Sequence, residues 1–185
     1  QHKREERNCR GEITHGDATR DENGARHYFM DLPGDGNFTG DMDVLLSAVD
    51  FAVFTIDAVD GVRPLTKKHW QAVTKAGIPS CCFINKMDRD RADFNIAYDG
   101  LSILGIKPVL LYAPIGSQAN FKGVVDVLGN KALLFNADGS VKEGPVPDDM
   151  QAEITSPREN AIANIAESAH ERLEKSLAER ERNEA

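Results

Sequence analysis

The chain is short, acidic and moderately apolar: it has 185 residues, 41% of them hydrophobic, and a formal net charge of −8. This composition allows one hydrophobic core, or one core with a small satellite. The acidic balance argues against a free-standing nucleic-acid-binding protein, because such proteins usually carry a basic face. The sequence lacks the run of about 18 apolar residues that a membrane-spanning helix needs. Its three cysteines do not form a disulfide framework.

The first part of the chain alternates between strand and helix patterns. Residues 1–20 are polar and are expected to be poorly ordered. Strand patterns follow at 25–30, 51–56 and 81–84, and the last two are apolar runs typical of strands buried on both faces. Helical spacing of apolar residues occurs at 39–49, 65–76 and 92–104. This alternation predicts an α/β fold, a parallel sheet with helices on both faces.

The pattern changes in the second part of the chain. A further strand is expected at 109–112, and the segments 121–127 and 131–135 predict a small antiparallel unit. Asp138-Gly139 is a strong hairpin turn, with Val141 beginning the return strand.

A helical composition begins at Asp148, and Pro157 is expected to break or restart the helix. Residues 179–185 have no apolar face and are expected to fray. An apolar stripe on this helix is expected to pack within the molecule; it consists of Ile162, Ile165, Ala169, Leu173 and Leu177. The change of pattern divides the chain into a sheet domain at 1–113 and a small α+β subdomain at 114–185.

Two loops that follow predicted strands contain candidate ligand-binding residues. Asp31-Leu32-Pro33-Gly34 comes after the first strand, and Asn85-Lys86-Met87-Asp88 comes directly after the third. Both therefore fall at the carboxyl ends of strands, where α/β sheets bind ligands. Each motif alone is weak evidence, because Asn-Lys-x-Asp occurs by chance in surface loops and Asp-x-Pro-Gly can be a plain turn. Together and in this order they indicate a guanine-nucleotide site.

The second loop has the chemistry needed to read a guanine base. The carboxylate of Asp88 can accept two hydrogen bonds, from the ring N–H and the exocyclic amino group of guanine. Adenine lacks this donor pair and would leave the charge unpaired, which costs more than a neutral hydrogen bond gains. The Lys86 stem can cover one face of the base, and the Asn85 side chain can tie the loop to neighbouring backbone.

Several segments resemble the translational GTPases, above all elongation factor G and its paralogues. They are RGEIT at 10–14, with one inserted residue, DLPGDGNF at 31–38, FAVFTIDAVDGV at 51–62, NKMDRDRADF at 85–94, and PIG at 114–116 followed by FKGVVD at 121–126. The last pair resembles an insert within the nucleotide domain of elongation factor G and release factor three. The resemblance covers roughly residues 8–177.

The resemblance implies a P-loop-GTPase-like sheet that binds GTP or GDP together with Mg²⁺. The implied nucleotide-binding residues are Asp31, Pro33, Gly34, Asn85, Lys86 and Asp88. Thr14 and Asp31 would serve the metal, although Thr14 could equally be an ordinary polar residue of a flexible arm. The implied setting is a cytoplasmic monomer that contacts the ribosome, with the insert facing the ribosomal stalk protein.

Two departures from the family pattern leave the activity open. No Gly-x-x-x-x-Gly-Lys-Ser/Thr phosphate loop occurs in the 185 residues, and Asp35 stands where the family has a His that positions the attacking water. One interpretation is an internal fragment of the GTPase domain of an elongation factor G-like protein that drives translocation. The alternatives are a non-hydrolysing pseudo-GTPase that contacts the ribosome and a GTPase like release factor three.

Replacing Asp35 by histidine in the whole gene product should accelerate ribosome-stimulated GTP hydrolysis. A carboxylate beside the γ-phosphate adds negative charge to an already negative site, whereas a histidine can position water. The expected gain is on the order of tenfold or more, with little change in nucleotide affinity. Single-turnover hydrolysis on ribosomes measures it, and an equal or faster rate with Asp35 would show that this carboxylate is functional.

Overall fold

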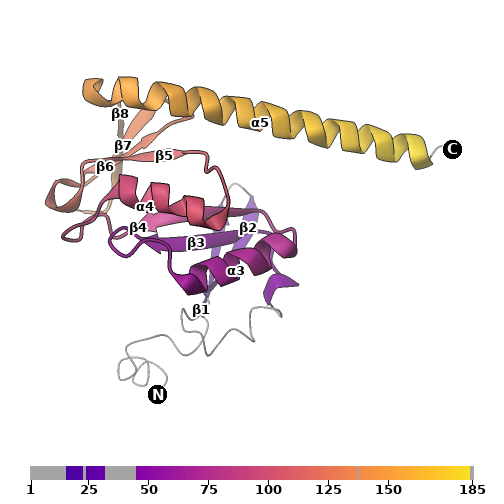
Figure 1. Ribbon diagram of the computed structural model, residues 1–185. Helices are drawn as coiled ribbons and strands as arrows, with labels where there is room; N and C mark the ends of the chain where they lie inside the picture. Colours follow the sequence, from indigo (N-terminus) through magenta and orange to yellow (C-terminus); the bar gives the residue numbers. More distant parts are fainter. Residues whose placement is uncertain (1–15, 23, 32–44, 137, 184–185) are drawn as a thin grey trace, which may run out of the picture. The chain divides into compact units, whose positions relative to one another are not determined.

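The computed structural model describes residues 16–22, 24–31, 45–136 and 138–183 (Figure 1). The chain divides into two compact units. The first contains the described residues up to Phe54 together with Pro64–Cys82, and the second contains Thr55–Arg63 and the described residues from Phe83 onward. Most of the expected helix at 39–49 lies outside the described residues.

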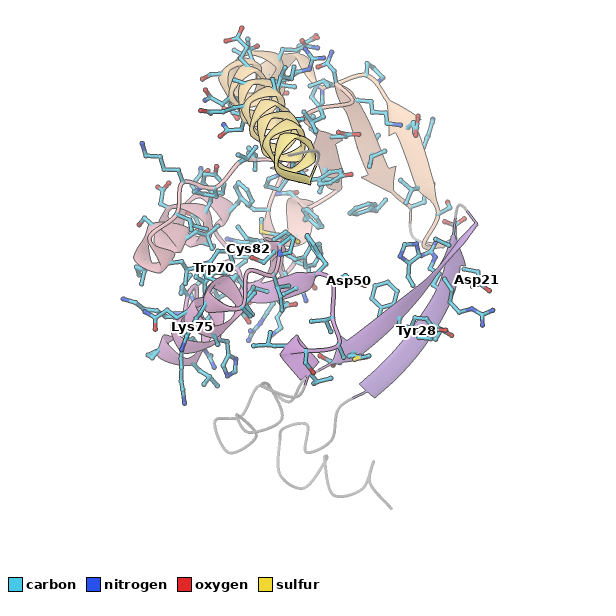
Figure 2. The ribbon with its side chains drawn as sticks, turned by 90° about the vertical axis from the view of Figure 1, so that its right-hand side faces the viewer. Asp21, Tyr28, Asp50, Trp70, Lys75 and Cys82 are labelled. Carbon is cyan, nitrogen blue, oxygen red and sulfur yellow. The ribbon has the colours of Figure 1, made fainter. Side chains whose placement is uncertain are left out.

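A two-stranded antiparallel ribbon opens the described part of the chain. It pairs β1 (Gly16–Glu22) with β2 (Ala25–Asp31), from Gly16 opposite Asp31 to Glu22 opposite Ala25. The Arg26 guanidinium donates to the Asp21 carboxylate, with Nε and Oδ1 2.8 Å apart; Figure 2 marks Asp21 and, on β2, Tyr28. The expected strand at 25–30 is confirmed. The prediction that residues 1–20 are poorly ordered is wrong for the part that belongs to β1. Pairing along seven residues supplies the hydrogen bonds that an isolated segment would lack.

A separate pair of strands, β3 (Ala52–Asp57) and β4 (Ser80–Asn85), runs parallel. Ala52 N–H donates to the carbonyl of Pro79, and Ala58 N–H donates to that of Asn85, so the register advances in the same direction along both strands. Helix α3 (Pro64–Lys75) provides the crossover that a parallel connection requires. The α/β class with a parallel sheet is confirmed. The strand β2, however, belongs to the antiparallel ribbon and not to this sheet among the described residues.

The prediction that β3 and β4 are buried on both faces is wrong. Exposure alternates along β3, with Val53 exposed and Ile56 buried, and Phe83 on β4 is also exposed. The covered side includes Phe54, whose ring centroid lies 5.0 Å from that of Trp70 on α3; Figure 2 marks Trp70. Successive side chains of a strand point to opposite faces, so the β3–β4 pair, covered on one side, buries only every second side chain.

The helix expected at 92–104 is shorter and changes type. Helix α4 spans Phe94–Gly100, and a 3₁₀ helix, η2, continues over Leu101–Leu104. Asp93 caps α4, because its Oδ1 accepts from the Ile96 N–H at 3.0 Å. The residue after η2, Gly105, has φ 77°, a left-handed conformation that glycine adopts without steric cost.

The second unit contains a four-stranded antiparallel sheet in the order β5-β6-β7-β8. Its strands are β5 (Tyr112–Ile115), β6 (Gly123–Asp126), β7 (Lys131–Phe135) and β8 (Val141–Gly144). The antiparallel unit and the return strand from Val141 are confirmed. The strand expected at 109–112 begins instead at Tyr112, because its pairing partner β6 ends at Asp126, opposite Tyr112. A Cβ added at Gly123 would lie 2.1 Å from the Leu133 carbonyl oxygen, so the close approach of β6 and β7 requires glycine there.

Helix α5 (Asp148–Asn183) runs without interruption through Pro157. The prediction of a break or restart at Pro157 is therefore wrong. The helix also continues as far as Asn183, although fraying was predicted from residue 179. Proline removes one helical hydrogen bond, to the carbonyl of Glu153, and that residue is exposed, so water can bond the orphaned carbonyl. Of the stripe expected to pack within the molecule, Ile162 and Ile165 are instead about half exposed.

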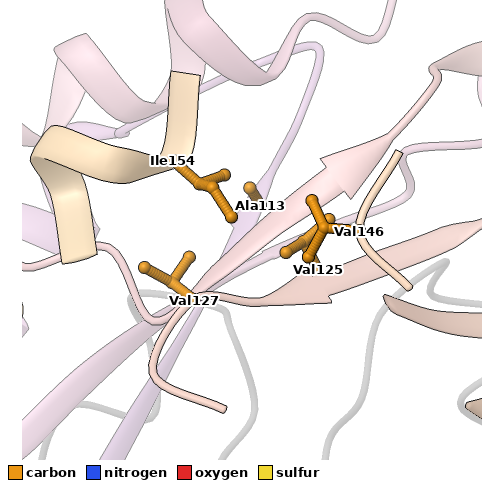
Figure 3. Packing of buried hydrophobic residues seen from close by; sticks show 5 residues of the cluster. All are labelled: Ala113, Val125, Val127, Val146 and Ile154. Carbon is orange, nitrogen blue, oxygen red and sulfur yellow. The ribbon is translucent and has the colours of Figure 1, made fainter. Parts of the chain in front are cut away.

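The start of α5 packs on the sheet. Figure 3 shows Ile154 of α5 beside Ala113, Val125, Val127 and Val146, a cluster in which every side chain is at most 6% exposed. The later turns of α5 run on beyond the sheet (Figure 1). This helix is long but polar, and among the described residues no helix combines the length and apolarity needed to cross a bilayer.

The thiol of Cys82 should resist alkylation in the native protein. Cys81 and Cys82 are both free, and burial, with Cys81 adjacent, raises the pKa of the Cys82 thiol to about 11. Because only the thiolate reacts, iodoacetamide at pH 8 should modify Cys82 roughly a hundredfold more slowly than in the protein unfolded by urea. Peptide mass spectrometry separates the cysteines, and equal rates in the two states would contradict this burial.

Candidate guanine-nucleotide site

The loop at 85–88 is anchored through one buried side chain. Asn85 ends β4, and Met87 is only 5% exposed. Met87 packs with Ala58 and Ala92, and partly buried residues surround this cluster: Val59, Ile84, Phe94 and Phe121. Asn85, Lys86 and Asp88 are exposed. Burial of Met87 therefore anchors the loop to the hydrophobic cluster, while the three polar side chains of the motif are exposed to solvent.

The loop backbone is strained at Lys86 and is held by Asn85. Lys86 has φ 62°, in the left-handed region, which costs a non-glycine residue roughly 1–2 kcal/mol. The side-chain Oδ1 of Asn85 accepts a hydrogen bond from the Lys86 N–H at 2.8 Å, and the Lys86 carbonyl accepts from the Arg89 N–H at 3.1 Å. Asn85 thus ties the loop to its own backbone, as the motif suggests.

Two other loops of the same unit are joined to this one by backbone hydrogen bonds. In the segment after β3, Ala58 N–H donates to the Asn85 carbonyl of the loop at 2.9 Å, and the Ala58 carbonyl accepts from the N–H of Asp93, the residue that caps α4, at 3.2 Å. The segment after β5 is bonded once, from Gln118 N–H to the Met87 carbonyl at 2.7 Å. Nothing in the sequence indicates the Gln118 contact, because it joins residues 31 positions apart.

A carboxylate from the end of β3 pairs with two cations of the loop. Asp57 Oδ2 lies 2.8 Å from Lys86 Nζ and 3.1 Å from an Arg89 nitrogen. The Lys86 ammonium, with the Val59 N–H next in effect, holds the pKa of Asp57 well below its usual range. In sequence, Asp57 was an ordinary strand-end carboxylate. Only its position at the carboxyl end of the strand paired with β4 could have indicated this role.

The Asp88 carboxylate is available to a ligand. Asp88 is exposed. In the described parts of the chain no donor or cation is bonded to its side chain. An unpaired carboxylate beside a lysine stem can accept two parallel N–H donors from a planar base while the stem covers the ring. The residues present therefore fit recognition of a guanine base.

The remaining candidates lie elsewhere. Asp31 ends β2, is exposed and belongs to the first unit, whereas the loop at 85–88 belongs to the second. Thr14, Pro33, Gly34 and Asp35 lie outside the described residues. Within the described ranges, no group of three or more His, Cys, Asp or Glu side chains could hold a metal ion. The Mg²⁺ role of Thr14 and Asp31 thus stays a prediction.

A parallel strand that ends in an anchored Asn-Lys-Met-Asp loop is the arrangement expected of a guanine-nucleotide-binding domain. The family model described as "Elongation factor Tu GTP binding domain" matches residues 2–178. The chain belongs to this family.

Individual relatives agree with the family. The chain is 35% identical over 164 residues to elongation factor G of Amoebophilus asiaticus, covering 86% of this chain and 23% of that protein. It is 36% identical over 157 residues to elongation factor G of Thermotoga maritima, covering 83% of this chain and 23% of that protein. A crystal structure of a Thermus thermophilus protein superposes with a TM-score of 0.81 at 25% identity, over 94% of this chain and 26% of that one. The chain thus spans about a quarter of the length of these proteins.

Replacing Asp88 by asparagine should change base preference in the whole gene product. The substitution turns a double acceptor into a mixed donor and acceptor, which weakens guanine and favours xanthine, whose edge carries a carbonyl in place of the amino group. Competition between GDP and XDP for the protein measures the preference. Asp90→Asn makes the same charge change two residues away and serves as the control. An unchanged preference in Asp88→Asn would mean that Asp88 does not face the base.

Proposed function

We propose that this chain is the guanine-reading part of an elongation factor G-like translation GTPase, which binds GTP and GDP with Mg²⁺ and hydrolyses GTP as it promotes translocation on the ribosome. The observation that carries the proposal is the exposed Asp88 carboxylate, which has no partner among the described residues, two positions after Lys86 in a loop anchored by Met87. Membership of the GTP-binding family and identity to elongation factor G support it.

In this proposal the two motifs of the sequence contact different parts of the nucleotide. Asp88 accepts the base-edge donors, Lys86 covers the ring, and Asn85 keeps the loop in shape. Asp31, Pro33 and Gly34 would face the phosphates, and Mg²⁺ near Asp31 and Thr14 would offset phosphate charge. The 185 residues contain no phosphate loop, so base recognition is the part of the function assigned to the described residues.

The proposed partners follow from the family. The sheet domain at 1–113 would hold the nucleotide, and the subdomain at 114–185 would face the ribosomal stalk protein. The subdomain has a core of its own, in which Ile154 of α5 packs against the β5–β8 sheet, and its Gln118 N–H donates to the Met87 carbonyl of the 85–88 loop. We propose that the whole protein acts as a monomer in the cytoplasm.

A second candidate is a binding module that contacts the ribosome without hydrolysis. One sequence observation favours it: Asp35 stands where the family has a histidine. Both candidates need guanine recognition, and only the first needs turnover. Nucleotide binding and ribosome-stimulated hydrolysis therefore separate them.

The whole gene product should bind GDP at least about a thousandfold more tightly than ADP, because a site built to pair a specific donor set rejects a base that lacks it. Fluorescent-nucleotide titration followed by competition with unlabelled GDP and ADP measures the ratio. Phosphate release on ribosomes then decides between the two candidates: turnover supports the translation GTPase, and binding without turnover supports the module. Equal affinity for GDP and ADP would refute both.

A further inference from the structure

We propose that Asp57 is a positioning residue that holds the guanine-reading loop in its strained shape by binding Lys86 and Arg89. This inference rests on the proposed function and deepens it. It assigns to the loop after β3 a role in recognition that the Asn-Lys-x-Asp motif does not contain.

The two oxygens of Asp57 have different partners. Oδ1 accepts from the backbone N–H groups of Val59 and Asp60, at 2.9 and 3.3 Å. The backbone of Asp57 also closes a tight turn, since its carbonyl accepts from Gly61 N–H at 2.8 Å and Gly61 has φ 65°. The carboxylate is therefore oriented by its own loop before any side chain of the neighbouring loop reaches it.

The second oxygen gathers two cations from the neighbouring loop. Oδ2 accepts from Lys86 Nζ at 2.8 Å and from an Arg89 nitrogen at 3.1 Å. The Asp57 side chain is only 14% exposed, whereas those of Lys86 and Arg89 are 52% and 53% exposed. Surface ion pairs of this kind add only about 0–1 kcal/mol each to stability. Their main consequence is geometric, because a fixed anion restricts two long side chains that would otherwise sample many rotamers.

Backbone strain is concentrated at the same place. Among the described residues, four non-glycine residues have positive φ, and two of them lie in the 85–88 loop or bond to it: Lys86 (62°) and Gln118 (56°). A third, Arg91 (66°), lies three residues after the loop. Such strain persists only where the surroundings hold it, and it gathers at binding sites. Asn85 holds the Lys86 N–H, Met87 fills the core, and Asp57 holds the Lys86 side chain. Asp57 is the only one of these three groups that lies outside the tetrapeptide.

The position of Lys86 matters for the base because its stem is the part of the loop proposed to cover the ring. A lysine released from Asp57 would spread over several rotamers and would have to be ordered again on each binding event. Among the described residues the Asp88 side chain has no hydrogen bond or ion pair, so its acceptors for the base edge would remain. Loss of Asp57 should therefore weaken binding of purine nucleotides without changing the choice among bases.

Asp57→Asn in the whole gene product tests this. The amide can keep an oxygen on the Val59 and Asp60 N–H groups but carries no charge for Lys86 and Arg89. We expect the dissociation constants of GDP and of IDP, which lacks the exocyclic amino group, to rise together by roughly tenfold, with their ratio unchanged. Asp60→Asn is the matched control, because it removes a carboxylate one turn away that pairs with Arg63 and should leave both constants unchanged.

A second readout needs no nucleotide. Hydrogen–deuterium exchange of the segment 85–93 in the free protein should be faster in Asp57→Asn than in the wild type and in Asp60→Asn. Lys86→Gln removes the same contact from the other side, so it should speed exchange in this segment too. Adding Asp57→Asn to it should change the exchange less than Asp57→Asn does alone, because the two residues act through one contact.

The outcomes separate the two proposals. Failure of the wild type to bind GDP would refute the proposed function, and the exchange data would still decide the role of Asp57. Unchanged exchange in Asp57→Asn, or a changed ratio of GDP to IDP affinity, would overturn the positioning role. If Asp57→Asn is unstable, Lys86→Gln decides alone: faster exchange at 85–93 supports the role, and unchanged exchange overturns it.

Discussion

Burial of Met87 is the constraint on which the candidate site depends. With Ala58 and Ala92 it forms the centre of a small apolar cluster, and this places the ends of β3 and β4 and the start of α4 around one point. Met87 is buried in this cluster, whereas Asn85, Lys86 and Asp88 are exposed. The backbone bonds of Ala58 to Asn85 and of Gln118 to Met87 then fix the loop among its neighbours. A loop that reads a base must be rigid before the base arrives, since ordering it on binding would reduce affinity.

The subdomain that follows is stabilised in a different way. Its sheet is antiparallel and is covered by the first turns of α5, where Ile154 meets Val125 and Val127 (Figure 3). None of these residues takes part in the 85–88 loop, although Gln118, just before β6, donates to it. The 85–88 loop is thus linked by a backbone hydrogen bond to the segment that joins β5 and β6 of the antiparallel sheet. A single bond of this kind transmits position more readily than it contributes stability.

Sequence patterns predicted the local elements well where one physical signal dominated. Alternation of strand and helix predicted β3, α3 and β4, and Asp138-Gly139 predicted the hairpin before β8. They failed where a neighbour decided the outcome. An apolar run cannot tell how many of its faces will be covered, so Val53 and Phe83 were expected inside and are exposed. Pro157 was expected to break or restart the helix, but the helix continues through it, because the hydrogen bond that proline removes is to the carbonyl of the exposed Glu153, which can bond water instead.

The sequence by itself determined the class of protein, and it predicted the residues that we propose to read the base, because Asn85, Lys86 and Asp88 belong to one short motif. Tertiary structure alone decided what holds these residues in place. Asp57 lies 29 positions before Lys86, and Gln118 lies 31 positions after Met87. Nothing in the composition of either segment indicates these contacts. The Gln118 contact arises because the segment after β5, a strand of the antiparallel sheet, lies against the 85–88 loop. The Asp57 contact arises because parallel strands bring their carboxyl ends together, and only the folded sheet places a carboxylate at the end of one strand beside a lysine at the end of the next.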